Sequence, residues 1–354
     1  MEPAIETLRT ALNSDPDKES ALILLGLAYE ADGRASFGEA QLAQAIDRNG
    51  LSPNLFQAYR GMLIRNGKAE DAADLTLRFA QTPDATRQVQ RESAAVLIGQ
   101  ERFEEAETVA RSLIRADGTD QDARRLLATT LLQQARNDEA IEALDQMSEE
   151  SQSELASVQI RAEALARSER FDDLRTYLDA KIEDGQLPEA YILRSQVEAS
   201  QGDLNRAASV ARAGVEAFPQ AENIYLALFN VHLAQAEMQA ANAVLDQGIA
   251  NAETTANLRV LRVNQYLQDG ERTMARDMLI SLAEDDQLNN LSANNLAALM
   301  LDLGDDPAEA LEIAKRFEGT QQPFFADTLA WAYYQNGDLT KAEEYAAIAG
   351  ETQA

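Results

Sequence analysis

The chain has 354 residues, of which 60 are acidic and 31 are basic, so its formal net charge is −29. Such a charge repels nucleic acid and anionic membrane surfaces, and we expect neither as a partner. Cysteine is absent, which excludes disulfides and thiolate metal sites, and no apolar run approaches the roughly 18 residues that a membrane-spanning helix needs.

Residues 2–12 predict a single amphipathic helix that ends before Pro16. The next stretch, Ser20 to Asn49, predicts two short amphipathic helices joined by a turn at Gly33. Small and apolar residues gather on one face of each helix. They are Leu25, Gly26 and Tyr29 in the first helix and Leu42, Ala45 and Ile46 in the second. Small residues at the crossing of the two helices let their backbones approach closely.

The turn at Gly33 recurs along the chain in steps of 34 residues, with a step of 33 at two places. The predicted turn positions are Gly33, Gly67, Glu101, Ala135, Glu169, Gly202, Ala236, Gly270, Gly304 and Gly337. Glycine suits a turn that ends a helix because it reaches positive φ without a steric penalty. Five residues after each turn we expect a small residue at the helix crossing. These residues are Gly38, Ala72, Ala106, Ala140, Ala207, Ala241, Ala275 and Ala342, with Leu174 an exception and Ala310 displaced by one position.

A helix-turn-helix unit of 34 residues with small and aromatic residues at these offsets resembles the tetratricopeptide repeat. The resemblance implies an all-α, right-handed superhelical solenoid of about ten units, in one continuous array over residues 17–354. The first helices are expected to begin at Glu19, Pro53, Arg87, Gln121, Leu155, Pro188, Glu222, Ala256, Asn290 and Pro323. All eight prolines agree with this frame, since each falls between units or at a predicted helix start.

Residues 1–16 are expected to be the second helix of a truncated unit, because Ala4 lies 34 residues before Gly38 and no first helix precedes it. Repeat arrays normally end in an atypical capping unit, so we expect the chain to be a fragment of a longer protein. The polar segment 147–155 is expected to be a flexible joint between units. No low-complexity linker interrupts the pattern, which favours one array over two domains.

The residues that carry most enzyme chemistry are scarce. The one histidine, His232, falls at a helix-internal position, which favours packing over catalysis. No phosphate-binding glycine loop or nucleophile motif is present. The acidic pairs Glu104–Glu105 and Asp172–Asp173 lie on predicted solvent faces. We therefore expect no catalytic residue, no cofactor and no metal site.

The first helices of the family that this chain resembles form the wall of a concave groove that binds protein or peptide segments. Positions five and nine of these helices are expected to face the groove, where asparagine offers both a donor and an acceptor to an extended peptide and arginine attracts an acidic group. The residues expected to contact a partner are Arg91, Arg125, Gln159, Gln196, Asn230, Asn264, Asn294, Asp327 and Trp331. The alternative is that such polar residues are hydrated or bond between helices.

The last units carry a second resemblance. Residues 294–297 (NNLA) and 327–331 (DTLAW) are similar to the terminal repeats of bacterial envelope proteins, namely the repeat lipoprotein of PEP-CTERM/exosortase systems and the periplasmic scaffolds of exopolysaccharide export. Ala330 stands where those proteins have glycine. The resemblance implies a scaffold in the periplasm or envelope. The aromatic residues around Trp331 are expected either to pack the last unit or to anchor a partner.

We expect a non-catalytic protein–protein interaction scaffold that binds a partner segment in the concave groove, in a bacterial envelope exopolysaccharide or protein-sorting system. Two alternatives stay open. One is a cytoplasmic peptide-binding adaptor or co-chaperone, which would carry a clamp of lysines and asparagines, although none of the few lysines falls at position five or nine. The other is the repeat region of a larger enzyme whose catalytic domain is absent from this sequence.

Overall fold

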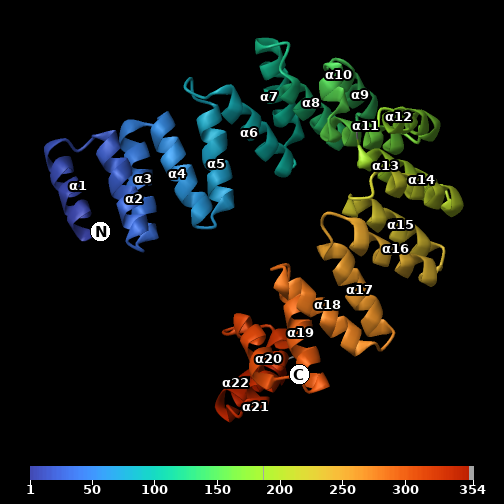
Figure 1. Cartoon of the computed structure of the whole chain (residues 1–354). Helices are drawn as coiled ribbons and strands as arrows, with labels where there is room; N and C mark the ends of the chain where they lie inside the picture. The colour runs from blue at the N-terminus through green and yellow to red at the C-terminus, as the bar shows by residue number, and fades with distance from the viewer. Residues whose placement is uncertain (186, 351–354) are drawn as a thin grey trace. The chain divides into compact units, whose positions relative to one another are not determined.

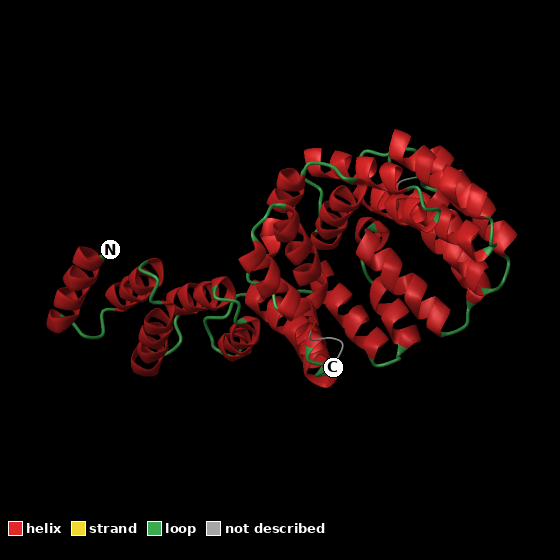
Figure 2. Cartoon of the chain, turned by 90° about the horizontal axis from the view of Figure 1, so that it is seen from below, coloured by secondary structure: helices red, strands yellow, loops and turns green. Residues whose placement is uncertain are grey.

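The computed structural model describes residues 1–185 and 187–350. Within these ranges the chain folds into 22 α-helices and one short 3-10 helix, η1 (Lys315–Phe317), without a strand (Figure 1, Figure 2). The all-α solenoid expected from the repeat pattern is thereby confirmed. Over the same residues, no helix has both the length and the hydrophobicity that crossing a bilayer demands.

Ten helix pairs make up most of the chain. The first helices are α2 (Glu19–Ala31), α4 (Pro53–Arg65), α6 (Arg87–Gly99), α8 (Gln121–Gln133), α11 (Leu155–Arg167), α13 (Pro188–Ser200), α15 (Glu222–Ala234), α17 (Ala256–Gln268), α19 (Asn290–Leu303) and α21 (Pro323–Gln335). The second helices are α3 (Ala35–Asn49), α5 (Ala69–Ala80), α7 (Phe103–Ala116), α9 (Asn137–Asp145), α12 (Phe171–Glu183), α14 (Leu204–Ala217), α16 (Met238–Asn251), α18 (Arg272–Glu284), α20 (Pro307–Ala314) and α22 (Leu339–Gly350). Every first helix begins at the expected residue.

The helix pairs are grouped into two compact units, Met1–Leu174 and Arg175–Ala354, and the boundary between them falls within α12. The core of each unit passes from pair to pair instead of forming one central cluster. The four largest apolar clusters span residues 22–89 and 110–164 in the first unit and residues 207–258 and 263–345 in the second. A solenoid buries apolar surface in this way because each repeat packs only against its neighbours.

All ten predicted turn residues adopt positive φ, which confirms the turn positions. Six of them are glycines, whereas Glu101, Ala135, Glu169 and Ala236 hold the same left-handed conformation at φ between 56° and 60°. An L-residue with a side chain is disfavoured there by roughly 1–2 kcal/mol. The packing of the two helices that flank each turn therefore imposes the turn conformation, whichever residue occupies it.

The helix crossing in the first pair depends on two glycines. A Cβ atom on Gly38 would lie 2.6 Å from the carbonyl oxygen of Gly26, and one on Gly26 would lie 2.8 Å from Leu42 Cγ. Both distances are too short for a real contact, so α2 and α3 can pack this closely only with glycine at these positions. The equivalent residues in the later pairs are buried as well, including Leu174 and the displaced Ala310.

The helices outside the ten pairs are α1 (Glu2–Ser14) and α10 (Glu149–Ser153). Helix α1 buries only Ile5, and Ala4 is exposed because α1 packs against a single neighbouring helix, α2. Helix α10 lies in the polar segment 147–155, where the Ser148 hydroxyl accepts a hydrogen bond from the Ser151 N–H. The segment expected to be a joint is thus a short capped helix.

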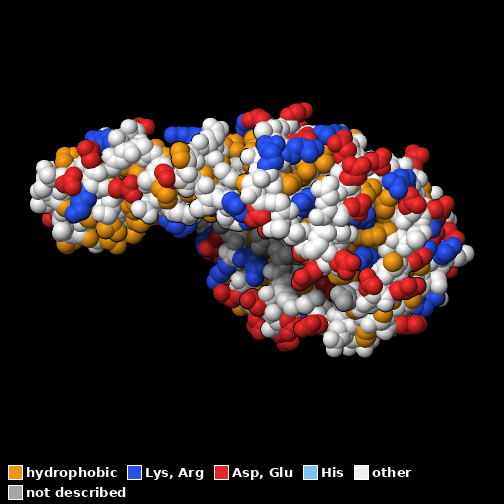
Figure 3. Space-filling view, turned by 90° about the horizontal axis from the view of Figure 1, so that it is seen from above, with side chains coloured by type: hydrophobic (Ala, Val, Ile, Leu, Met, Phe, Trp, Pro, Cys, Tyr) orange, Lys and Arg blue, Asp and Glu red, His pale blue; other side chains and the backbone are white. Residues whose placement is uncertain are grey.

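The residue that follows each turn changes its sign of charge between the two units. In the first unit it is always basic: Arg34, Lys68, Arg102, Arg136 and Arg170. In the second unit it is always acidic: Asp203, Glu237, Glu271, Asp305 and Asp338. Figure 3 shows acidic, basic and apolar side chains mixed over one face of the molecule.

Some of these residues form ion pairs that link consecutive repeats. Lys68 pairs with Glu39, and Arg136 Nη1 lies 2.7 Å from Glu107 Oε2. In the second unit the same pairing occurs with the charges exchanged, because Arg276 Nη1 lies 2.9 Å from Asp305 Oδ1. In all three pairs the residues are 29 positions apart.

Candidate functional site

Three carboxamide side chains lie at equivalent positions on three consecutive first helices of the second unit. Gln196, Asn230 and Asn264 come from α13, α15 and α17, and each is the ninth residue of its helix. Neighbouring helices of this set are in contact. All three side chains are exposed, and none has a hydrogen-bond partner among the residues that the structure describes. We call these three residues the carboxamide row.

The row is exposed because the other faces of its helices are occupied by the core. In α15, the residues on both sides of Asn230, Phe229 and Val231, are buried, together with Tyr225 and Leu228. Asparagine is a weaker helix former than alanine, so its presence in the middle of α15 does not stabilise the helix.

Hydrogen bonds between repeats fix the spacing of the row. The Glu222 carboxylate on α15 accepts hydrogen bonds from the backbone N–H of Asn257 (2.9 Å) and from its side-chain amide (3.0 Å), at the start of α17. The Asn223 amide donates to Glu189 on α13 at 3.1 Å. The first unit contains the same device, in which Asn54 on α4 donates to Glu19 on α2 at 3.1 Å.

The two arginines of the predicted site are bound to carboxylates of the chain itself. Arg91 on α6 makes a bidentate pair with Asp120, at 3.2 and 2.8 Å, and Asp120 also caps α8 through the N–H of Ala123. Arg125 lies 2.6 Å from Glu154 and 3.2 Å from Asp122. The acidic groups that these arginines were expected to attract are therefore already supplied by the chain itself, by Asp120 and Glu154 of the following repeat and by Asp122 of the same helix as Arg125.

The Arg91–Asp120 pair shifts both pKa values. The hydrogen bond to Asp120 raises the pKa of Arg91. Burial alone would raise the pKa of Asp120, but the hydrogen bonds from Arg91 and from the Ala123 N–H outweigh it, so the pKa of Asp120 is lowered. Both groups stay charged at neutral pH, and the pair acts as a link between repeats.

The remaining predicted residues are scattered. Gln159 and Asp327 are exposed, and Trp331 is half-buried against the last apolar cluster. The expected exposure of Asn294 is wrong, since only 2% of this residue is accessible. Asn294 is the fifth residue of α19, whereas the residues of the carboxamide row are each the ninth of their helices. The structure brings together Gln196, Asn230 and Asn264 and separates Asn294 from them by burial.

The residues weighed for chemistry lie where the sequence places them. His232 is 6% exposed, and its Nδ1 lies 2.9 Å from Glu237 Oε2, as expected of a packed histidine. The acidic pairs of α7 and α12 are exposed. Among the described residues, no group of three or more His, Asp or Glu side chains is arranged to hold a metal ion.

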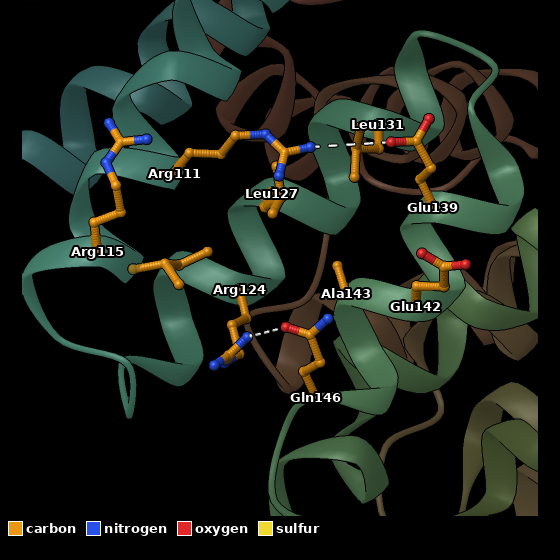
Figure 4. Close-up of a pocket in the computed structure, with 10 residues that line it drawn as sticks. Arg111, Arg115, Arg124, Leu127, Leu131, Glu139, Glu142, Ala143 and Gln146 are labelled. Atoms are coloured by element: carbon orange, nitrogen blue, oxygen red, sulfur yellow. Dashed lines mark hydrogen bonds and ion pairs between the residues drawn. The ribbon is translucent and has the colours of Figure 1, made fainter.

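A second group of charged residues was missed by the sequence analysis. Arg111, Arg115 and Arg124 line a pocket of about 250 Å³ between α7, α8 and α9, and none of the three is at position five or nine of a first helix (Figure 4). The repeat register itself contains the signal, because these three positions are not arginine in the neighbouring repeats.

Comparisons with known proteins give one family match and several distant structural likenesses. The tetratricopeptide repeat family model matches residues 97–164. A tetratricopeptide repeat protein from Parabacteroides merdae has a TM-score of 0.47 at 16% identity, over 69% of this chain and 96% of that one. The Naa15/Naa10 complex bound to HypK-THB has a TM-score of 0.45 at 16% identity, over 97% and 60%. The human IFIT1 dimer with PPP-AAAA has a TM-score of 0.34 at 11% identity, over 95% and 91%. No curated protein matches the chain.

Proposed function

Because the chain is a solenoid of tetratricopeptide repeats, we propose that it is a non-catalytic scaffold that binds an extended segment of a partner protein along the carboxamide row. The observation that carries the proposal is the row itself, three exposed carboxamides on consecutive first helices with no hydrogen-bond partner in residues 1–185 and 187–350. Each carboxamide offers one acceptor and two donor hydrogens, which match the N–H and C=O groups of an extended backbone.

The charges of the chain favour a protein partner over nucleic acid. The formal net charge is −29, and the arginines at position five, Arg91 and Arg125, are bound to carboxylates. Phosphate recognition needs cations that are free to replace counterions. We therefore do not propose RNA or DNA as a partner.

The adaptor alternative, with a clamp of lysines, finds little support. Four of the five lysines, namely Lys68, Lys181, Lys315 and Lys341, form ion pairs with acidic residues of the chain. A lysine held by a neighbouring carboxylate is not free to bind the carboxylate of a peptide. The other alternative, a catalytic domain elsewhere, concerns sequence beyond residues 1–354 and leaves the role of the row unchanged.

We do not extend the proposal to an envelope system. The residues that carry the envelope resemblance are largely packing residues, since Leu296 and Ala297 in α19 and Thr328 and Leu329 in α21 are buried. Packing of the last repeats is sufficient to account for them. The choice between periplasmic and cytoplasmic clients is left to the identity of the captured partner.

The proposal is tested by capture from membrane and soluble fractions of the source organism, with the wild-type chain and the Asn230→Ala/Asn264→Ala variant as baits. Because each lost hydrogen bond weakens binding by about 0.5–1.5 kcal/mol, we expect the double variant to bind its partner about tenfold more weakly. Its helical content and melting temperature should not fall, since alanine is the better helix former.

The matched control is Gln239→Ala/Gln247→Ala. It removes two exposed carboxamides from α16, the second helix of the repeat that carries Asn230. This control should retain the partners of the wild type. Equal capture by the wild type and the Asn230/Asn264 variant would exclude the row as the binding surface.

A further inference from the structure

The pocket lined by the three arginines lies between two second helices of the first unit. Helix α7 contributes Arg111 and Arg115, α8 contributes Arg124, and α9 forms the opposite wall. Ile114, Leu127 and Leu131 supply apolar surface to the same pocket. Figure 4 shows Arg111 extending across the opening toward Glu139 on α9. We call this site the arginine pocket.

The preceding repeat forms an equivalent pocket that lacks the three arginines. A pocket of about 360 Å³ lies between α5 and α7, and its lining residues are those 34 positions earlier in the chain. Leu77, Gln81 and Gln90 stand there in place of Arg111, Arg115 and Arg124. One repeat further toward the N-terminus, the equivalent residues are Ala43, Asp47 and Phe56. In the repeat that follows the arginine pocket, they are Asp145, Glu149 and Val158. The repeat fold therefore does not require a cation at any of the three positions.

Two of the three guanidinium groups lack a carboxylate partner. Arg111 is held by Glu107, with Nε at 2.8 Å from Oε1. Arg115 is exposed and has no hydrogen bond or ion pair among the described residues. Arg124 donates only to neutral oxygens, the Gln146 amide at 2.7 Å and the Gly118 carbonyl at 2.8 Å. The Arg124 Nε is buried and donates to no acceptor.

The opposite wall limits the anion that can enter. Glu139 is bound to Arg136, while Glu142 is exposed and has no partner among the described residues. A ligand with several negative charges, such as a polyphosphate, would meet repulsion from this wall. A single carboxylate can instead bind at Arg124. Figure 4 shows the Arg115 and Arg124 side chains pointing apart, so the exposed Arg115 changes rotamer to join the same carboxylate. The acidic wall can accept hydrogen bonds from peptide N–H groups.

We propose that the arginine pocket binds a segment of a partner protein in which an apolar side chain stands next to a single carboxylate. The apolar side chain packs on Ile114, Leu127 and Leu131, and the carboxylate pairs with Arg115 and Arg124. The arginine pocket is built from α7, α8 and α9 of the first unit, whereas the carboxamide row is on α13, α15 and α17 of the second unit. The two surfaces are therefore independent, and one holds whether or not the other does.

The test uses two blocked hexapeptides that differ in one residue. One contains the pair Leu-Asp between Gly-Ser ends, and the other contains Leu-Asn. Binding to the full chain is detected by saturation-transfer NMR and quantified by titration of peptide line widths. Because hydrogen bonds to charged groups are about twice as strong as neutral ones, we expect the Leu-Asp peptide to bind about tenfold more tightly than the Leu-Asn peptide.

The decisive variant removes all three arginines from the pocket. Arg111→Leu/Arg115→Gln/Arg124→Gln introduces the residues that the preceding repeat already carries at these positions. This variant should bind both peptides equally and weakly. The single change Arg115→Gln, which touches no other described residue by hydrogen bond or ion pair, should reduce the preference for Leu-Asp without affecting the fold, and it keeps the test valid if the triple variant unfolds.

Three results would overturn the proposal: no binding of the Leu-Asp peptide to the wild type, equal binding of the two peptides, or an undiminished preference in Arg115→Gln and in the triple variant. The Asn230→Ala/Asn264→Ala variant should keep the full preference for Leu-Asp, because its substitutions lie in the other unit. The capture experiment therefore tests binding at the carboxamide row, and the peptide experiment separately tests binding at the arginine pocket.

Discussion

At the scale of single residues, the turns show how far one repeated pattern predicts conformation. Glu101, Ala135, Glu169 and Ala236 carry no local signal for a left-handed backbone, yet the spacing of the glycines at other turns predicts their positive φ correctly. The exposure of a side chain is harder to predict. Asn294, at position five of α19, and Asn230, at position nine of α15, were both expected to be exposed, but only Asn230 is.

The first residue-scale prediction concerns the turns. Replacing Ala236 by glycine should raise the free energy of unfolding by about 0.5–1 kcal/mol, since it removes the penalty of a left-handed alanine while glycine adds some unfolded-state entropy. The reverse change, Gly270→Val, should lower it by more than about 1 kcal/mol, because φ is 78° and a branched side chain strains there. Urea unfolding followed by circular dichroism measures both.

The Gly270 change also has an internal control. No atom lies within 4 Å of a Cβ built on Gly270, so the loss must come from the backbone and not from a clash. The Gly270→Val variant should still capture the partner of the carboxamide row. If Ala236→Gly were destabilising, the strain assigned to this turn would be wrong.

The second residue-scale prediction concerns pH. Asp117 accepts hydrogen bonds from the side chain and backbone N–H of Thr119 and from Arg87, and these lower its pKa to about 2. A carboxylate whose folded pKa is depressed stabilises the fold above its unfolded pKa of about 3.9, and that stability is lost as the pH falls through the folded value. Asp117→Asn should therefore be less stable than the wild type at pH 7, and the difference should shrink below about pH 4. Urea midpoints from pH 7 to 3 provide the measurement, and a difference independent of pH would contradict the assignment.

At the scale of elements, the repeat pattern predicts helix boundaries well and partners poorly. Prolines and turn residues mark the ends of helices locally, so each first helix begins where expected. Whether Arg91 and Arg125 are free to bind a partner depends on the following repeat, because each arginine pairs with an acidic residue 29 positions later in the chain. These pairs cannot be predicted when each helix face is considered alone. The arginine pocket is missed for the same reason, because it is built from three helices.

The ion pair between Lys68 and Glu39 gives the prediction at this scale. Lys68→Glu and Glu39→Lys should each lower the urea midpoint, because each places like charges together across two repeats. The exchanged double variant should recover about half or more of the combined loss, as expected for a directly coupled pair. Recovery stays incomplete because Glu39 also accepts a hydrogen bond from the Asn66 amide at 3.0 Å.

The double variant is compared with the two single variants in the same buffer at low and high salt. Added salt should reduce all three differences, since Lys68 is about half exposed. Strictly additive effects of the two changes would show that the residues do not interact.

At the scale of the whole molecule, the sequence predicts the architecture, because each repeat restates the same pattern and errors at one position are corrected by the others. The division into two compact units was not foreseen, since helix pairs follow one another without a linker and the boundary falls inside α12. Candidate binding surfaces follow from the sequence only in part, and their role in binding stays a proposal. The carboxamide row follows from position within the repeat, while the identity of a partner is not encoded in any periodicity.

The residue after each turn is basic in the first unit and acidic in the second, and this difference limits how repeats can be added or exchanged. A repeat that carries Glu107 is matched to a successor with a base after its turn, and one that carries Arg276 is matched to a successor with an acid. Duplicating a repeat inside its own unit preserves this match. Moving Glu107 next to an acid such as Asp305 would instead set two carboxylates against each other. A repeat duplicated or inserted within its own half should therefore be tolerated. A repeat moved from one half into the other should destabilise the chain, because the order of acid and base in its ion pair is reversed there.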